Sequence, residues 1–349
     1  MSDVRTLVQA SRLYYELGET QERIAEILHV TRPQVSRLLK EARAEGIVEI
    51  RVIDATQELP DVAARLRERF GLRLAAVAPT LAGPGDLSRR LVGRRAAQLL
   101  RDFIHEGSIV GVGDGAAMAA TADALEDGIP PVHATFVPLS GGGFSAPWKD
   151  PVRRMAEAFG GQALDLFAPG LVENETTREV LLDHLGNQTV ARAWEQMDLA
   201  LFGIGSYVRS EAWFGEQLLA ELDAAGTVGE IMISPFDIQG SFVSDRLRTM
   251  VIGMDARELK RVPIRIGAAS GADKVRPILG ALRTGLITDL VTDVQTAEEV
   301  LALAAATRPG GEGVTPPPAS AGKSRGRPAP RQPGRDGALP DPIHAGTSR

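Results

Sequence analysis

Four basic side chains near the N-terminus have the types and spacing needed to contact nucleic acid. Arg32, Arg37, Lys40 and Arg43 fall in a short stretch that holds one acid, Glu41. Arg reads guanine and Gln reads adenine bidentately, each worth about 1–3 kcal/mol, whereas basic residues farther along a helix contact phosphate. The stretch predicts a DNA-reading surface, with a merely solvated basic face as the alternative. The predicted DNA-binding residues are Thr20, Gln21, Thr31, Arg32, Gln34, Ser36, Arg37, Lys40 and Arg43.

A second set of residues could hold a small hydroxylated or anionic molecule. Glycine-rich turns at 111–115, 141–143, 203–206 and 270–272 follow apolar segments. Without Cβ atoms, such turns let backbone N–H groups approach a ligand at the carboxyl ends of parallel strands. Lys274 supplies a compact cation, unless it is a surface lysine paired with Asp273 or Glu230. The predicted effector-binding residues are Gly113, Asp114, Gly115, Ser140, Gly141, Gly142, Gly205, Ser206, Glu230, Asp237, Gly271 and Lys274, with Asp293 nearby.

Other chemistries have weaker support in the sequence. The absence of cysteine excludes disulfides, thiolate metal sites and a cysteine nucleophile, and the five histidines show no metal-ligand spacing. The segment 111–116 fits a permissive dinucleotide pattern, but the next strand ends at Ser140 without the carboxylate that a ribose needs. The segment 322–324 resembles part of a phosphate-binding loop, whose first glycine would fall on Pro317. We therefore expect no cofactor and no metal.

Three short helices are predicted to position the DNA-reading residues. The first covers about residues 4–17 and ends at Gly18, and the second covers about 20–28. The third opens at Thr31, where Gln34 and Pro33 complete a capping-box pattern. Two helices joined by a tight turn are typical of a helix-turn-helix, whose second helix enters the major groove. The alternating segment 47–53 predicts a strand or wing after them.

From residue 72 onward, apolar strands alternate with longer helical segments. The predicted strands are 72–77, 109–112, 135–139, 163–167, 199–204, 230–234, 251–253, 264–268 and 286–291. The predicted helices are 87–104, 117–125, 152–159, 216–224, 275–282 and 297–306. This alternation is typical of a Rossmann-like α/β domain with a mostly parallel sheet covered on both faces.

Composition and charge divide the chain of 349 residues into four predicted parts. These are a helix-turn-helix domain (1–54), a linker helix (55–71), an α/β domain (72–307) with the predicted effector site, and a disordered tail (308–349). The net charge is −6, and residues 1–54 hold 8 Lys and Arg against 9 Asp and Glu, so any DNA contact must be local. The tail holds 9 Pro and 8 Gly in 42 residues. Its segment 325–328 resembles an AT-hook core, a match that arises easily by chance in such a composition.

The chain has no recognisable signal sequence and no apolar run near the ~18 residues of a membrane helix, so we expect a cytoplasmic protein.

Several segments of the chain resemble the SorC family of bacterial sugar-responsive transcriptional regulators. The resemblance begins with residues 14–25 and 31–50, continues through 203–206, 226–231 and 236–240, and is strong from 271 to 293. It covers about residues 4–306. The resemblance implies an effector domain related to sugar-phosphate isomerases, oligomerisation through that domain, and operator binding controlled by a sugar or sugar phosphate.

The chain departs from the family where phosphate is often held. Ala116 and Ala117 replace hydroxyl residues, and Ser140 stands where phosphate-binding relatives often have arginine. Asp114 just before them would repel a phosphate but accept hydrogen bonds from sugar hydroxyls. Our hypothesis is an uncharged or weakly charged polyol, or a phosphate held mainly by Lys274 and backbone N–H groups.

The combined expectation is a DNA-binding transcriptional regulator, not an enzyme, whose operator affinity is controlled by a carbohydrate or sugar-phosphate effector. Its partners would be double-stranded operator DNA, the effector and further copies of itself, as a dimer or tetramer. The alternative is an isomerase or deaminase with an accessory DNA-binding domain, in which Asp114 and Glu230 would supply the acid and base.

Overall fold

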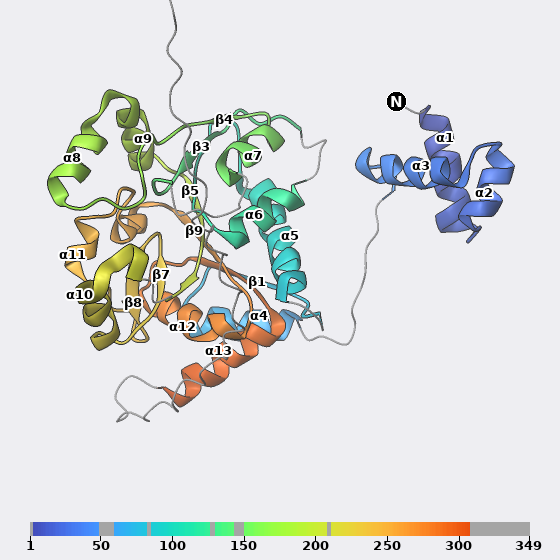
Figure 1. Ribbon diagram of the computed structural model, residues 1–349. Helices are drawn as coiled ribbons and strands as arrows, with labels where there is room; N and C mark the ends of the chain where they lie inside the picture. Colours follow the sequence, from blue (N-terminus) through green and yellow to red (C-terminus); the bar gives the residue numbers. More distant parts are fainter. Residues whose placement is uncertain are drawn as a thin grey trace, which may run out of the picture. The chain divides into compact units, whose positions relative to one another are not determined.

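The chain forms an N-terminal helical domain and an α/β domain (Figure 1). The computed structural model describes residues 3–48, 59–81, 85–125, 130–142, 150–207 and 211–307. The predicted tail and most of the predicted wing lie outside these residues. Ile47 and Val48, the described part of the wing, are not in a strand.

The helical domain is built from α1 (Val4–Ser11), a π-helical turn (Arg12–Glu16), α2 (Gln21–Leu28) and α3 (Arg32–Ala44). Thr20 caps α2, because its Oγ1 accepts the Arg23 N–H at 3.2 Å. His29 ends α2 in the left-handed region, with a φ of 54°, and so makes the tight turn into α3. The helices enclose a small core of Leu7, Ala10, Ile24, Ala25, Val35, Leu38, Leu39 and Ala42. The predicted helix-turn-helix is confirmed.

The α/β domain is organised around a seven-stranded sheet in which every strand pair is parallel. Its spatial order is β1 (Leu74–Ala78), β10 (Asp289–Asp293), β9 (Ile264–Ala268), β5 (Leu199–Gly203), β2 (Ile109–Val112), β3 (Thr135–Pro138) and β4 (Gln162–Ala163). The first strand therefore pairs with the last. Buried apolar side chains alternate between the two faces, as a doubly covered sheet requires. The predicted α/β class is confirmed.

Each face of this sheet has its own layer of helices. One core includes side chains of α5 (Gly85–Phe103), α6 (Ala116–Ala124) and α7 (Pro151–Ala158). The opposite core includes side chains of α4 (Leu59–Phe70), α9 (Leu185–Glu195), α12 (Val275–Arg283) and α13 (Val294–Ala306). Helix α8 (Glu175–Asp183) precedes α9. Among the described residues, no helix is long and apolar enough to span a membrane.

A second sheet of three antiparallel strands lies beside α12. It is formed by β6 (Gly205–Ser206), β7 (Thr227–Ile231) and β8 (Ser234–Asp237). Helix α10 (Glu211–Ala224), with a kink at Gly215, lies between β6 and β7 in the chain, and the short α11 (Asp245–Arg248) follows β8. The last connections are the 3-10 turns Ala256–Arg261 and Ala272–Lys274.

Three strand predictions were wrong. The segment 230–234 is the end of β7 plus a turn into β8, so it belongs to an antiparallel hairpin. Of 163–167, only Ala163 is in a strand, and 251–253 makes isolated bridges to Leu171 and Ser140. Helices α8 and α9 were not predicted at all.

Candidate functional site

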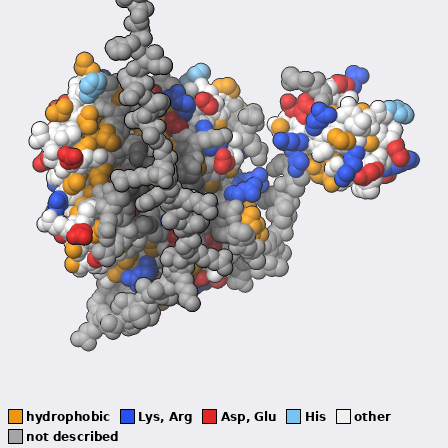
Figure 2. Space-filling view, viewed as in Figure 1, with side chains coloured by type: hydrophobic (Ala, Val, Ile, Leu, Met, Phe, Trp, Pro, Cys, Tyr) orange, Lys and Arg blue, Asp and Glu red, His pale blue; other side chains and the backbone are white. Residues whose placement is uncertain are grey.

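The exposed face of α3 carries the predicted DNA-reading residues. Arg32, Ser36, Arg37, Lys40 and Arg43 are all exposed, whereas the alternate face of α3 is buried in the domain core. These positions recur at three- and four-residue intervals, which places them along one stripe of the helix. On the visible side of this domain, Lys and Arg side chains lie between acidic ones (Figure 2). The stripe has the length and charge to follow a DNA groove.

Two side chains that are predicted to bind DNA, those of Arg32 and Gln34, interact with other residues of the helical domain. The Arg32 guanidinium lies 2.7 Å from the Glu22 carboxylate of α2, with both side chains largely exposed. The Gln34 side-chain oxygen accepts the Thr31 N–H at 2.7 Å and its hydroxyl at 2.9 Å. Arg32 can change partners at little cost, because exposed ion pairs contribute about 0–1 kcal/mol. A bidentate contact from Gln34 to adenine would instead require it to leave the cap.

Thr20 and Thr31 serve as helix N-cap residues, and Gln21 is the first residue of α2. Arg43 is partly tied to its own helix, since its Nε donates to the Leu39 carbonyl at 3.3 Å. Thr20 and Thr31 therefore help to start the two helices, and the DNA contacts expected of Thr20, Gln21 and Thr31 stay predictions.

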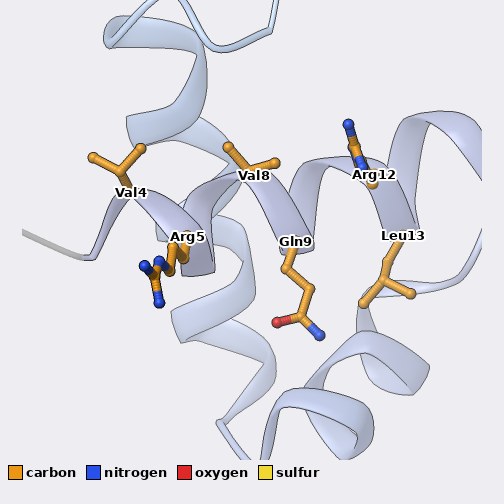
Figure 3. A pocket seen from close by; sticks show the side chains of 6 residues that line it. All are labelled: Val4, Arg5, Val8, Gln9, Arg12 and Leu13. Carbon is orange, nitrogen blue, oxygen red and sulfur yellow. The ribbon is translucent and has the colours of Figure 1, made fainter.

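The helical domain also has a shallow hollow along α1, with a volume of about 380 Å³. Figure 3 shows its lining, which comes from α1 and the start of the π-helical turn: Val4, Arg5, Val8, Gln9, Arg12 and Leu13. None of the predicted DNA-binding residues lines it, and we assign it no ligand.

A larger cavity of about 600 Å³ lies at the carboxyl ends of the parallel strands. The turns after β2, β3, β5 and β9 all contribute to it, as the topology of an open α/β sheet predicts for a ligand site. Nine of the twelve predicted effector residues line it: Gly113, Asp114, Gly115, Ser140, Gly141, Gly205, Ser206, Glu230 and Lys274.

Gly142, Asp237 and Gly271 are not part of the cavity lining. Asp237 stabilises the turn after β8, because its Oδ1 accepts the N–H groups of Gln239 and Ser241 at 2.9 and 2.8 Å. Gly271 has a φ of 115°, and its N–H donates to the Thr296 hydroxyl. Asp293 is buried and caps α13, with its Oδ2 2.6 Å from the same hydroxyl. These residues shape the turns around the cavity without facing it.

Asp114 directly precedes the N-cap residue of α6. Its Oδ1 accepts the Gly115 N–H at 2.7 Å, and Gly115 is the N-cap of that helix. A helix N-terminus attracts anions because its first N–H groups lack intrahelical acceptors. The Asp114 carboxylate therefore adds a negative charge next to the N-terminus of this helix.

Glu230 and Lys274 form the charged centre of the cavity. The Glu230 carboxylate accepts the Ile233 N–H at 2.7 Å, and a Cβ on Gly205 would overlap the same carboxylate. Burial raises the pKa of Glu230, although the Ile233 N–H and the charge of Lys274 oppose the rise. Burial also lowers the pKa of Lys274, while Asp273 and Glu230 favour its charged form. A hydroxyl-rich ligand could satisfy both groups, since it donates to one and accepts from the other.

Four polar lining residues were missed by sequence reasoning: Arg89, Tyr207, Ser270 and Asp273. Arg89 lies on α5 and is close enough to lower the pKa of Lys274. The Ser270 hydroxyl is buried without a hydrogen-bond partner, which leaves it available to a ligand. Ser270 and Asp273 flank a predicted glycine turn and could have been included, but nothing in the helical pattern around Arg89 distinguishes it. No group of acidic or histidine side chains suited to a metal occurs in the described part of the chain.

Comparisons with known proteins agree with both halves of this description. Residues 54–302 match the Sugar-bind family model of a sugar-binding domain, and residues 1–49 match a homeodomain-like model. The full-length sorbitol operon regulator SorC from Klebsiella pneumoniae has the same fold, with a TM-score of 0.69 and 28% identity, covering 86% of this chain and 99% of that one. This chain belongs to the SorC family.

Two curated relatives within the SorC family illustrate its range. The sorbitol operon regulator of Klebsiella pneumoniae is 29% identical over 317 residues, covering 86% of this chain and 98% of the relative. The deoxyribonucleoside regulator of Bacillus subtilis is 31% identical over 316 residues, covering 84% and 96%. Like them, the chain is a transcriptional regulator that combines a helix-turn-helix with a sugar-binding domain. The resemblance stated from the sequence is confirmed.

Proposed function

We propose that this SorC-family regulator binds operator DNA through α3 and releases or tightens that contact when a carbohydrate occupies the α/β cavity. The proposal is supported most directly by the cavity itself, which gathers Asp114, Ser206, Glu230 and Lys274 at the carboxyl ends of the strands. It acts as a ligand sensor and not as an enzyme, in the cytoplasm, as a homo-oligomer whose several α3 helices engage one operator.

The polar groups favour a neutral, hydroxylated effector over a phosphate. Asp114 already places a carboxylate at the N-terminus of α6, and Glu230 and Asp273 add two more acidic side chains against Arg89 and Lys274. A sugar can donate hydroxyls to the carboxylates and accept from Lys274 without adding charge.

Effector control then follows from a shift between two states of the regulator. An effector changes operator affinity only if it binds one state more tightly than the other. The glycine turns after β2, β5 and β9 are the segments that a ligand would draw together. This movement would alter the spacing of the α3 helices within the oligomer, and so their fit to an operator.

The DNA-binding half is tested by replacing Arg32 and Arg37 together with alanine. Operator affinity, measured by fluorescence anisotropy with DNA from the regulator's own upstream region, should fall by at least about tenfold, because base contacts are worth about 1–3 kcal/mol each. The matched control replaces Arg153 and Arg246, two exposed, ion-paired arginines of the α/β domain. It removes the same charge and should leave operator affinity within about twofold of the parent. Equal affinities of all three proteins would refute the assignment of α3.

The effector-binding half is tested by Lys274→Met in the same assay. A screen of free sugars, polyols and their phosphates against the regulator–DNA complex should find ligands that change affinity for the parent. The variant should bind DNA normally but respond only at about tenfold or higher effector concentration, since it lacks the cation. If no carbohydrate changes DNA affinity of the parent, effector control by this cavity is wrong. Turnover of any ligand found would favour the enzymatic alternative.

A further inference from the structure

Three large apolar side chains of the α/β domain, which we call the α8–α9 patch, lie open on its surface. Phe167, Val180 and Leu185 are 67%, 65% and 81% exposed. In Figure 2, hydrophobic side chains gather over the part of the domain that α8 and α9 form. Single exposed apolar residues are common on any protein, whereas a contiguous apolar patch marks an interaction site. The question is therefore whether the three side chains are neighbours.

The buried Asn187 of α9 holds the elements of the patch together. Its Oδ1 accepts the Phe167 N–H at 2.8 Å, and its Nδ2 donates to the Leu181 carbonyl in α8 at 2.7 Å. A Cβ on Gly186 would lie 3.4 Å from the Phe167 ring. Phe167 therefore lies beside the start of α9, where Leu185 is the first residue, and beside the end of α8 that carries the third side chain.

The patch also adjoins a wall of the effector cavity. Gly141 lines the cavity, and a Cβ on it would overlap the Pro169 backbone. The Gly142 N–H donates to the Ala168 carbonyl at 3.1 Å. The segment that carries Phe167 is therefore bonded to the turn that borders the cavity, so a partner on the patch would be held close to the ligand.

The size of the patch fits a protein–protein contact. The three side chains leave on the order of 400 Å² of apolar surface open, since a fully exposed side chain of this size presents ~150–200 Å². A standard interface covers ~800 Å² of each partner, and a little over half of that area is apolar. The patch therefore supplies most of the apolar area that one stable interface needs.

We infer that the α8–α9 patch binds the same patch of a second copy of this chain, in a two-fold pair. This inference rests on the proposed function, in which the regulator is a homo-oligomer, and it names the surface that joins two copies. An apolar patch is complementary to itself about a two-fold axis. A two-fold pair also supplies the two α3 helices that an operator with two half-sites requires. The chain's own segment 308–349 is a poor match, because its large apolar residues are only Val314, Leu339 and Ile343.

The test is sedimentation velocity of the full chain over a range of protein concentrations. In the double variant Phe167→Ser/Leu185→Ser, the dissociation constant of the pair should rise at least about tenfold, because each copy loses two apolar side chains from the contact. The matched control is Leu81→Ser. It removes another exposed apolar side chain, after β1 and so at the opposite edge of the sheet from β4. Its dissociation constant should stay within about twofold of the parent value.

Leu185→Arg is a second variant that tests the same contact by a different change. It places a charge within the apolar contact and should weaken the pair at least as much as the double variant does. Both patch variants should keep the circular dichroism of the parent, because the replaced side chains are exposed. If the parent associates and the patch variants associate equally well, the inference is wrong and the homo-oligomer of the proposed function stands. A parent that binds its operator as a monomer would overturn both.

Discussion

Asp114 shows how a single side chain can select the charge of a ligand. Its carboxylate accepts the Gly115 N–H at the start of α6 and faces the cavity. We expect Asp114→Asn to bind phosphorylated sugars about tenfold more tightly than the parent, because one repelling charge is removed from a partly exposed site. Binding of neutral sugars should change little. Calorimetry with matched sugars and sugar phosphates provides the measurement, and a parent that already prefers the phosphate would contradict this role.

Glu230 should make the stability of the protein depend on pH. Burial raises its pKa in the folded state above the ordinary 4.5, so the ionised carboxyl costs stability as the pH rises from 4.5 through the folded value. Below 4.5 the group is protonated in both states and the cost disappears. We therefore expect Glu230→Gln to melt at a higher temperature than the parent at pH 7.5, with a gap that closes toward pH 4.5.

Glu106 serves as the control for Glu230, because its pKa is shifted in the opposite direction. Its pKa is lowered by hydrogen bonds from His133, so the ionised form adds stability above its ordinary value of 4.5. Glu106→Gln should melt at a lower temperature than the parent at pH 6, where the carboxyl is ionised in both states, and equally near pH 3. A higher melting temperature of Glu230→Gln that persists at pH 4.5 would show that packing, not ionisation, explains it.

The sequence predicted polar residues next to turns better than it predicted which other polar side chains line the cavity. Lys274 could be predicted because it follows the glycine turn 270–272, and Glu230 because it is an acidic residue directly after Gly229 in the segment 226–231 that resembles the family. Arg89 could not, since it is one of several arginines on the polar face of α5 and only the packing of α5 beside α6 brings it to the cavity. Asp237 and Asp293 have the right types and positions, but local hydrogen bonds direct their carboxylates to backbone N–H groups.

Helices α5 and α6 approach each other closely at one glycine. A Cβ on Gly93 would lie 2.5–2.9 Å from backbone and side-chain atoms of Ala120. Gly93→Ala should therefore force the helices apart and destabilise the α/β domain by about 1–3 kcal/mol in denaturant unfolding. It should also weaken effector binding, because Arg89 and Ala116 of the same two helices line the cavity.

Gly186 in α9 provides the control for Gly93, because it is also a glycine within a helix. Its Cβ would meet only an exposed histidine side chain at 3.3 Å and Phe167 at 3.4 Å, so Gly186→Ala should cost little or stabilise slightly. Equal effects of the two substitutions would mean that helix propensity, and not the contact between α5 and α6, governs Gly93.

Elements with strong local signals were predictable and those without them were not. The capping-box pattern at Thr31 and Gln34 marked the start of α3, and the apolar run at 199–204 marked β5. The β7–β8 hairpin was missed because Met232 and Ile233 replace the Asn and Gly that reveal such turns. Helices α8 and α9 were not predicted, because the exposed apolar residues Val180 and Leu185 weaken the amphipathic pattern of these helices.

The charge of the whole molecule limits how it can hold DNA. With a net charge of −6, binding depends on the few cations of α3 and not on a general attraction. We expect Lys40→Ala to weaken binding to all DNA sequences alike and to reduce the slope of log affinity against log salt by about 1 for each subunit bound. Arg37→Ala should instead relax sequence preference with a smaller change of slope. Anisotropy titrations at several salt concentrations, with operator and scrambled DNA, separate the two outcomes.

The pairing of β1 with β10 has a consequence for how the protein is made. Arg73, next to β1, binds the buried carboxylate of Asp289 in β10, a residue 216 positions later. During synthesis the first strand therefore emerges from the ribosome long before its partner exists, and contacts this distant in sequence form slowly. Until translation passes residue 293, an apolar strand edge is left uncovered, so messages truncated before that point should yield chains that depend on chaperones or are degraded.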